Sequence, residues 1–290
     1  MEDIAGLLSH LNNLNNFSID LTLPSSNKKV KVREMLIKDQ MNVFKCAQAA
    51  PSGYEESMYL DMLNSIVIHP AGFDSREVPE VDVTYLLIYN RIITHGPEVS
   101  LLTKCNGKIE GNGICGEPQS LIYNLSERNV LNRIEEALSG LYPMKLEIGD
   151  YTIHLTYLKE TDNLAIEDNL LGFIHSFYSG SVNPNSMSKK DTDKIKSFLK
   201  MSGRISKIEY KDKGTIKSYD VINETLEKKV EIFMALPAVV SYKAIEEVVV
   251  KLSDVAEKLT DKLEYTCEKC GNKGDVPINM LNKSFFVDRF

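Results

Sequence analysis

Two cysteines near the C-terminus constrain this chain more than any other feature of its sequence. Cys267 and Cys270 are separated by two residues and are followed directly by Gly271. This Cys-x-x-Cys-Gly pattern is typical of a turn that presents two thiolates to one zinc ion. Because a structural zinc ion takes four ligands in a tetrahedron, the rest of the chain must supply two more.

The best candidates for those two ligands lie far upstream. Cys105 and Cys115 enclose a segment with three glycines, and a further glycine follows Cys115. A site shared by both pairs would join two distant segments of the chain. Four thiolates leave no open position for water or substrate, so a zinc ion bound there would be structural. We therefore predict one structural Zn²⁺ site, formed by Cys105, Cys115, Cys267 and Cys270.

The sequence leaves alternatives to this shared site. The two pairs could bind separate ions or remain reduced thiols, and His95 is a reserve ligand. Lys104, Lys269 and Lys273 flank the cysteines and would offset the negative charge left after zinc binding, which favours the shared site. A redox dithiol is disfavoured because that motif usually opens a helix in a βαβ unit, whereas here it is expected to follow a helix and precede a strand.

Charge and cysteine content exclude other classes of partner and framework. The 290 residues carry a formal net charge of -7, so we expect no nucleic-acid partner and no anionic membrane surface, since both need a basic patch. The sequence shows no transmembrane stretch, and its first residues lack the basic and long apolar regions of a secretory signal. In a reducing cytoplasm, five cysteines favour metal ligation plus one buried thiol, Cys46, over disulfides.

Alternation of apolar and polar residues predicts strands in the first half of the chain. We expect a hairpin over 19–32, and strands over 99–103 and 121–125 that bring the two upstream cysteines to facing strand ends. A further hairpin is predicted over 144–157, with a two-residue turn at Gly149-Asp150.

Helical spacing of apolar residues predicts helices elsewhere. They are expected at about 39–50, 55–67, 190–201, 226–236 and 245–259. The last helix is expected to lead straight into Cys267. The run 81–94 is apolar enough to be a buried helix or a buried strand, and periodicity alone does not decide between them. A polar loop is expected over 179–188.

These elements predict an α+β chain of β-hairpins and helices with a C-terminal zinc-ribbon-like knuckle. We expect five regions: an N-terminal lead-in at 1–17, a hairpin plus helices at 18–98, a β-hairpin region with the first cysteine knuckle at 99–180, a mainly helical region at 181–264, and the C-terminal zinc knuckle with an aromatic tail at 265–290.

The sequence offers no catalytic constellation. It has no phosphate-binding glycine loop, no His-Glu-x-x-His and no nucleophile elbow, and its five histidines show no ligand spacing. A metal-dependent enzyme would need a three-ligand site beside a carboxylate base, which no group of residues provides. We therefore expect no catalytic residues, no enzymatic activity and no small-molecule partner.

Three aromatic residues at the C-terminal end are candidate partner-binding residues. Phe285, Phe286 and Phe290 fall within six residues, where a terminal strand has little room to bury three rings. Such rings are common anchors at protein interfaces. The alternative is that Phe285 and Phe286 pack back onto the preceding helix, which is expected to end near Leu263.

The order of these features resembles the baseplate hub protein family of T-even-type contractile-tailed phages. The resemblance rests on the hairpin that leads into Val30–Asp39, the cysteines between strands in the middle of the chain, the hairpin at 144–157, and the terminal helix followed by Cys267-x-x-Cys270-Gly and Phe285-Phe286. It extends over most of the chain, apart from 1–17 and about 160–225.

The resemblance implies a structural or assembly role in the central hub of the tail baseplate, either as a virion component or as an assembly factor only. Partners would be other tail and baseplate hub proteins, with the tape-measure protein as one candidate. The protein would work in the host cytoplasm during assembly and in the virion tail baseplate. The alternative function is a zinc-ribbon adaptor in nucleic-acid metabolism, which the acidic net charge disfavours.

Overall fold

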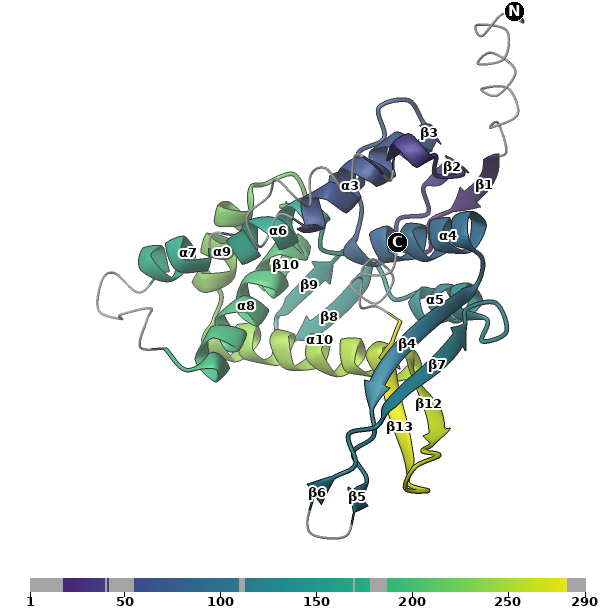
Figure 1. The fold of residues 1–290 in the computed structure, drawn as a ribbon. Coiled ribbons are helices and arrows are strands. Elements are labelled where there is room, and N and C mark those ends of the chain that lie inside the picture. The colour runs from purple at the N-terminus through teal and green to yellow at the C-terminus, as the bar shows by residue number, and fades with distance from the viewer. Residues whose placement is uncertain are drawn as a thin grey trace, which may run out of the picture. The chain divides into compact units, whose positions relative to one another are not determined.

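The computed structural model describes residues 18–39, 41, 55–109, 113–168, 170–177 and 187–280. The chain divides into two compact units, of which unit 1 combines residues 1–75, 81–137 and 256–290 and unit 2 combines residues 76–80 and 138–255. Each unit contains both helices and strands (Figure 1), as expected for an α+β chain. Of the helices within the described residues, none is long and apolar enough to cross a membrane.

Unit 1 begins with a three-stranded antiparallel sheet. The hairpin expected over 19–32 is confirmed as β1 (Ser18–Thr22) and β2 (Lys29–Arg33), and β3 (Val67–His69) pairs with the other edge of β2. The helix expected over 55–67 is α3 (Glu55–Ile66), which leads directly into β3.

The apolar run at 81–94 is a helix, α4 (Glu80–His95). Nine of its sixteen residues are buried, so it lacks the wide polar face that would have revealed a helical period in the sequence. One of the buried residues, Asp82, accepts hydrogen bonds from the amides of Ser25 and Ser26 at 2.9 and 3.0 Å. These bonds fix the turn between β1 and β2 on the side of α4.

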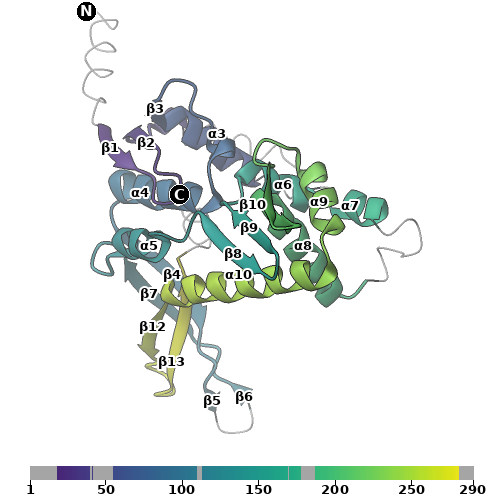
Figure 2. The ribbon, with the colours of Figure 1, turned by 180° about the vertical axis from the view of Figure 1, so that it is seen from behind.

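The cysteine-bearing part of unit 1 consists of hairpins and one helix. Its elements are β4 (Glu98–Lys104), β5 (Lys108–Ile109), β6 (Gly113–Ile114), β7 (Pro118–Asn124), α5 (Val130–Leu138), β12 (Thr260–Thr266) and β13 (Lys273–Asn279). β4 pairs with β7, β5 with β6, and β12 with β13, each pair antiparallel. β12 lies beside β7 (Figures 1 and 2), so the C-terminal hairpin packs on strands from the middle of the chain.

Unit 2 is built on a four-stranded antiparallel sheet of order β11-β10-β9-β8. The strands are β8 (Met144–Ile148), β9 (Tyr151–Leu155), β10 (Ile205–Asp212) and β11 (Thr215–Asp220), and the helices are α6 (Glu160–Asp168), α7 (Leu170–Phe177), α8 (Lys189–Gly203), α9 (Leu226–Ala235) and α10 (Ala238–Lys258). The hairpin expected over 144–157 is confirmed, with Ile148 opposite Tyr151 across the predicted turn.

The core of unit 2 lies between this sheet and its helices. α10 crosses the sheet (Figure 2), and its residues Val240, Ala244 and Val248 share a buried apolar cluster with the strand residues Ile153 and Ile208. A second buried cluster joins α6, α7, α8 and α9. The sheet face and the helices are therefore held by two adjoining apolar cores, which supply most of the stabilisation expected of such a domain.

In the last third of the chain two strands were missed and two expectations need correction. β10 and β11 were not predicted, because a register irregularity between Ile205 and Lys207 interrupts the alternation of β10 and because every residue of β11 is exposed. The long helix ends at Lys258 rather than near Leu263, and β12 separates it from Cys267. Leu259 and Leu263 are four positions apart, a spacing that imitates a helix although both flank or lie within β12.

Several expectations fall outside the described residues. These are the lead-in at 1–17, most of the helix expected over 39–50, most of the loop at 179–188, the thiol of Cys46, and the aromatic residues Phe285, Phe286 and Phe290.

Candidate metal centre

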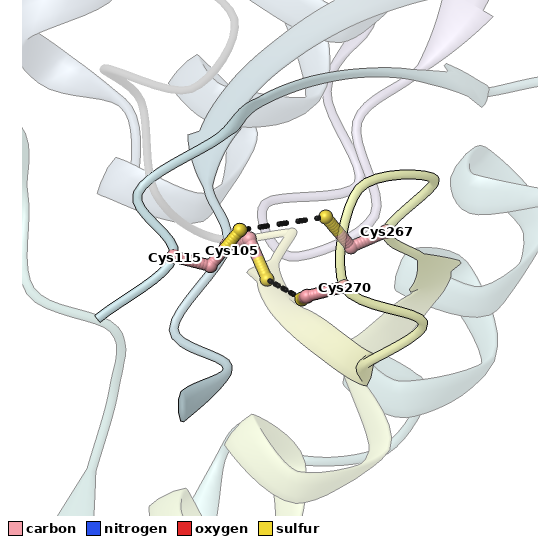
Figure 3. Close-up of side chains that lie close together, drawn as sticks. All are labelled: Cys105, Cys115, Cys267 and Cys270. Atoms are coloured by element: carbon pink, nitrogen blue, oxygen red, sulfur yellow. Dashed lines mark hydrogen bonds between the residues drawn. The ribbon is translucent and has the colours of Figure 1, made fainter. Parts of the chain in front are cut away.

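Four cysteine sulfurs from the two hairpin pairs of unit 1 gather at one point. The Sγ atoms of Cys105, Cys115, Cys267 and Cys270 all lie within 4.8 Å of one another (Figure 3). The Sγ atoms of Cys105 and Cys270 are 3.6 Å apart, and those of Cys115 and Cys267 are 3.9 Å apart. Each short distance therefore joins one upstream to one downstream cysteine.

These distances fit a metal ion and not a disulfide. A disulfide bond is about 2.05 Å long, and all four cysteines are free. Four thiolates at about 2.3 Å from a tetrahedral ion lie about 3.8 Å from one another, close to the two sulfur distances given above. The four cysteines could hold a metal ion with little movement of their side chains.

The first cysteine pair is brought together by the small hairpin β5–β6. This hairpin projects from the ends of β4 and β7, so the nine residues between Cys105 and Cys115 leave the two side chains adjacent. The Cys115 amide donates to the Gly107 carbonyl at 2.8 Å, and the Gly116 amide donates to the Cys105 carbonyl at 3.0 Å. Gly116 has a φ of +65°, a backbone conformation that glycine adopts without strain.

The second pair occupies the turn between β12 and β13. The Cys267 amide donates to the Asn272 carbonyl at 2.9 Å, and the Gly271 amide donates to the Cys267 carbonyl at 2.8 Å. Gly271 has a φ of +69°, so each pair is followed by a glycine in the left-handed region. Both glycines noted in the sequence thus serve the same purpose, which is to turn the chain sharply after the second cysteine of each pair.

Polar contacts outside the sulfur cluster join the two cysteine turns. Lys269 donates to the Glu117 carboxylate at 2.9 Å, and Asn272 donates to the Asn106 side chain at 3.3 Å. Each contact links the turn of Cys267 and Cys270 to the segment around Cys105 and Cys115. The two turns are therefore held in register by groups besides the cysteines.

The far end of the C-terminal hairpin is also anchored. Asp261 in β12 accepts hydrogen bonds from Tyr123 in β7 at 3.0 Å and from Arg133 in α5 at 3.2 Å. Burial acts to raise the pKa of Asp261, but the Lys262 amide, the Tyr123 hydroxyl and the arginine charges outweigh it, so this pKa lies below its usual value. Asp261 is thus held as a carboxylate that ties β12 to β7 and α5.

Hydrogen bonds prepare two of the sulfurs for a metal. The Gly107 amide donates to the Cys105 sulfur at 3.3 Å, and the Gln119 side chain donates to the Cys267 sulfur at 3.5 Å. The Cys270 amide lowers the pKa of Cys267 to about 7, against the opposing effect of burial and with help from the Lys269 amide. Donors of this kind stabilise thiolates and are common around metal-bound cysteines.

The pKa of Cys270 shifts in the opposite direction, and the cause of this shift explains why the cluster suits a cation. The Asn272 amide acts to lower the pKa of Cys270, but desolvation and the adjoining thiols together raise it to about 12. Four sulfurs this close cannot all ionise beside one another. A divalent cation at their centre removes that repulsion and takes the place of the protons.

Among the predicted site residues, the structure brings all four cysteines together and excludes the reserve ligand. The cluster does not include His95, which ends α4. The lysine charge expected beside the thiolates is present at Lys269, although Glu117 neutralises much of it. The Cys-x-x-Cys turn lies between two strands, which is not the start of a helix that a redox dithiol requires.

Three residues around the cluster were not predicted. Glu117, Gln119 and Asn272 contact the sulfurs or the lysine beside them. Glu117 follows the first Cys-Gly directly and Asn272 follows the second, so their proximity to the cysteines was visible in the sequence. Their roles depend on the pairing of the two turns, and the sequence did not reveal that pairing.

The comparison with known families identifies the class of protein. The model of the family described as T4 bacteriophage base plate protein matches residues 15–287, which is nearly the whole chain. The chain therefore belongs to this family, and the resemblance noted in the sequence is confirmed at the level of a T4-type phage baseplate protein. No curated protein and no solved structure matches the chain.

We predict that Cys267→Ser lowers both the metal content and the melting temperature. Cys115 and Cys267 are 152 positions apart, and a cross-link closing a loop of that order contributes about 4–5 kcal/mol in the chain-entropy model. For a chain of this size the melting temperature should fall by about 10 °C or more, as measured by calorimetry together with elemental analysis.

The matched control is Cys46→Ser, which should leave the metal content of the protein unchanged because Cys105, Cys115, Cys267 and Cys270 already supply the four ligands of a tetrahedral site. If Cys267→Ser melts within about 2 °C of the unmodified chain, the cluster does not hold unit 1 together.

Proposed function

We propose that this baseplate protein is a structural or assembly component of the central hub of the phage tail baseplate. Membership of the baseplate family supports a role among tail proteins. The four-cysteine cluster supports a role in which the metal maintains shape, since four thiolates leave no position for a substrate. The acidic net charge of -7 favours this function over a zinc-ribbon adaptor that acts on nucleic acid.

The observation that best supports a structural role is the complete set of four sulfur ligands. A catalytic zinc site in proteins keeps three protein ligands and an open position for water. Here four cysteines could supply every ligand of a tetrahedral ion. We therefore propose that the chain has no catalytic turnover and acts by binding other tail proteins.

Zinc is the metal we propose for the cluster. Thiolate ligands in a tetrahedron select zinc or iron–sulfur centres. Sulfur atoms 3.6 and 3.9 Å apart enclose the space for one ion.

We expect the purified chain to contain one zinc ion, bound with Zn–S distances of about 2.3 Å. Elemental analysis of freshly reduced protein gives the stoichiometry, and X-ray absorption spectroscopy gives the ligand type and distance. Absence of zinc would contradict the proposal, and two zinc ions would contradict the shared site while leaving both cysteine turns as ligands.

For the hub location, we predict that an affinity-tagged chain from infected cells co-purifies with baseplate hub proteins. Quantitative mass spectrometry of purified virions then distinguishes a subunit of the finished tail from an assembly factor, since only a subunit is retained in the virion. A tagged chain that co-purifies only with outer baseplate or tail-tube proteins would contradict the hub assignment and leave the family assignment intact.

We further propose that Phe285, Phe286 and Phe290 contact the partner protein. They lie beyond the described residues, at least five positions after Met280. The β12–β13 hairpin that precedes them is attached to β7 through Asp261 and through the clustered cysteines. A rigid support of this kind would present the aromatic side chains to a partner without a large cost in conformational entropy.

We predict that replacing all three phenylalanines with alanine abolishes co-purification with hub or tape-measure proteins, because buried aromatic anchors carry much of the affinity of an interface. Zinc content and solubility should stay at the level of the unmodified chain. The matched control is Lys283→Ala in the same segment, which should retain the partners. A triple variant that still binds them, or that loses its zinc, would show that these side chains belong to the fold.

A further inference from the structure

Unit 2 contains an apolar groove that its own core does not fill. The groove has a volume of about 1210 Å³ and is lined by α8, the end of α9 and the first half of α10; we call it the α8–α10 groove. Its floor includes Phe198 and Phe233, whose ring centroids are 5.1 Å apart. Figures 1 and 2 show the three helices side by side.

α10 has more apolar surface than the sheet covers. One stripe, which includes Val240 and Val248, is buried in the core of unit 2. A second stripe with helical spacing, which includes Tyr242, Ile245 and Val249, faces the groove. Tyr242 is 71% exposed and Val249 is 53% exposed. A helix needs one apolar stripe to pack on a sheet, so the second stripe indicates a docking surface.

The rim of the groove is basic. Lys189, Lys190 and Lys194 at the start of α8 line it, and Asp193 is its one acidic lining residue. In the part of the chain that the structure describes, the ion pairs of α8 use Lys196 and Lys200 and not these three lysines. The N-terminal end of α8 adds further positive potential. The groove therefore favours an occupant that is apolar on one side and acidic at one end.

The size of the groove favours a helix over a small molecule. Small-ligand pockets usually measure about 300–1,000 Å³, and this groove is larger. Amphipathic helices bind such grooves through apolar residues at positions i, i+3, i+4 and i+7.

The segment 1–17 of this chain has the matching pattern. It lies outside the described residues, but its sequence has leucine and isoleucine at the spacing of one helical face, at Ile4, Leu7, Leu8, Leu11 and Leu14. Its charged residues are Glu2 and Asp3, and it contains no lysine or arginine. It is therefore apolar on one face and acidic at one end, complementary to the groove in both respects.

We propose that the α8–α10 groove binds residues 2–14 of a second copy of this chain as an amphipathic helix. Its leucines cover the second apolar stripe of α10, and Glu2 and Asp3 lie against the lysines of α8. The connection from Leu14 to β1 spans at most about 14 Å, which restricts docking within one chain, whereas a second copy is under no such restriction. The interaction links successive copies and is independent of the metal centre.

The test uses the full chain and a labelled synthetic peptide of residues 1–17. Fluorescence anisotropy should show binding that weakens at least about tenfold for a peptide with Leu7→Asp and Leu11→Asp, since both side chains would face the apolar floor. A peptide with Glu2→Lys and Asp3→Lys should bind more weakly at low salt, and this difference should shrink as salt screens the charges. Analytical ultracentrifugation of the full chain should show self-association that excess peptide reverses.

Matched variants of the chain locate the binding site. Tyr242→Asp should weaken peptide binding at least about tenfold and abolish self-association, with unchanged zinc content. Tyr219→Asp should do neither, because Tyr219 is a 52% exposed tyrosine on β11 and does not line the groove.

Three outcomes would overturn the proposal. The first is a peptide that does not bind, and the second is binding that Tyr242→Asp leaves intact. The third combines two results. The chain stays monomeric at high concentration, and it binds the unmodified peptide only when its own segment carries Leu7→Asp and Leu11→Asp. That outcome would assign the groove to the same copy's segment. None of these outcomes bears on the hub or zinc proposals, which have separate readouts.

Discussion

Cys115 and Cys267 are 152 positions apart in the sequence, yet their sulfur atoms are 3.9 Å apart. This proximity is the constraint on which unit 1 depends, because it sets where the β12–β13 hairpin packs. The hairpin has only two strands, and an isolated two-stranded hairpin is marginally stable in water. The Asp261 contacts with Tyr123 and Arg133 and the Lys269–Glu117 pair fix it to β7 and α5. The four clustered cysteines could add a shared metal ion to these contacts.

Unit 2 depends on a different kind of interaction. Its sheet and helices enclose ordinary apolar cores, and no cysteine of the described residues takes part in them. Its unusual feature is α10, which covers the sheet with one apolar stripe and leaves a second stripe in the α8–α10 groove. Both units bury apolar side chains, and in unit 1 the clustered cysteines could add metal ligation to that burial.

A protein built into a baseplate needs surfaces that stay in place while partners bind. In unit 1 the β12–β13 hairpin is tied to β7 and α5 through Asp261, and unit 2 contains a groove with a basic rim. Both features are consistent with membership of the T4-type baseplate family.

The sequence by itself predicted the four cysteines as one cluster, the hairpins at 19–32 and 144–157, and the strands that lead to Cys105 and away from Cys115, because spacing and alternation are local signals. It did not resolve the run at 81–94, since a helix buried on nearly every side has no periodic pattern. It missed three strands, each for a different reason. The register of β10 is irregular, every residue of β11 is exposed, and the spacing of Leu259 and Leu263 made β12 look like a continuation of the helix. The contacts of Glu117 and Asn272, the anchoring of Asp261 and the α8–α10 groove were decided only by tertiary structure, because each depends on segments that meet in space and not in sequence.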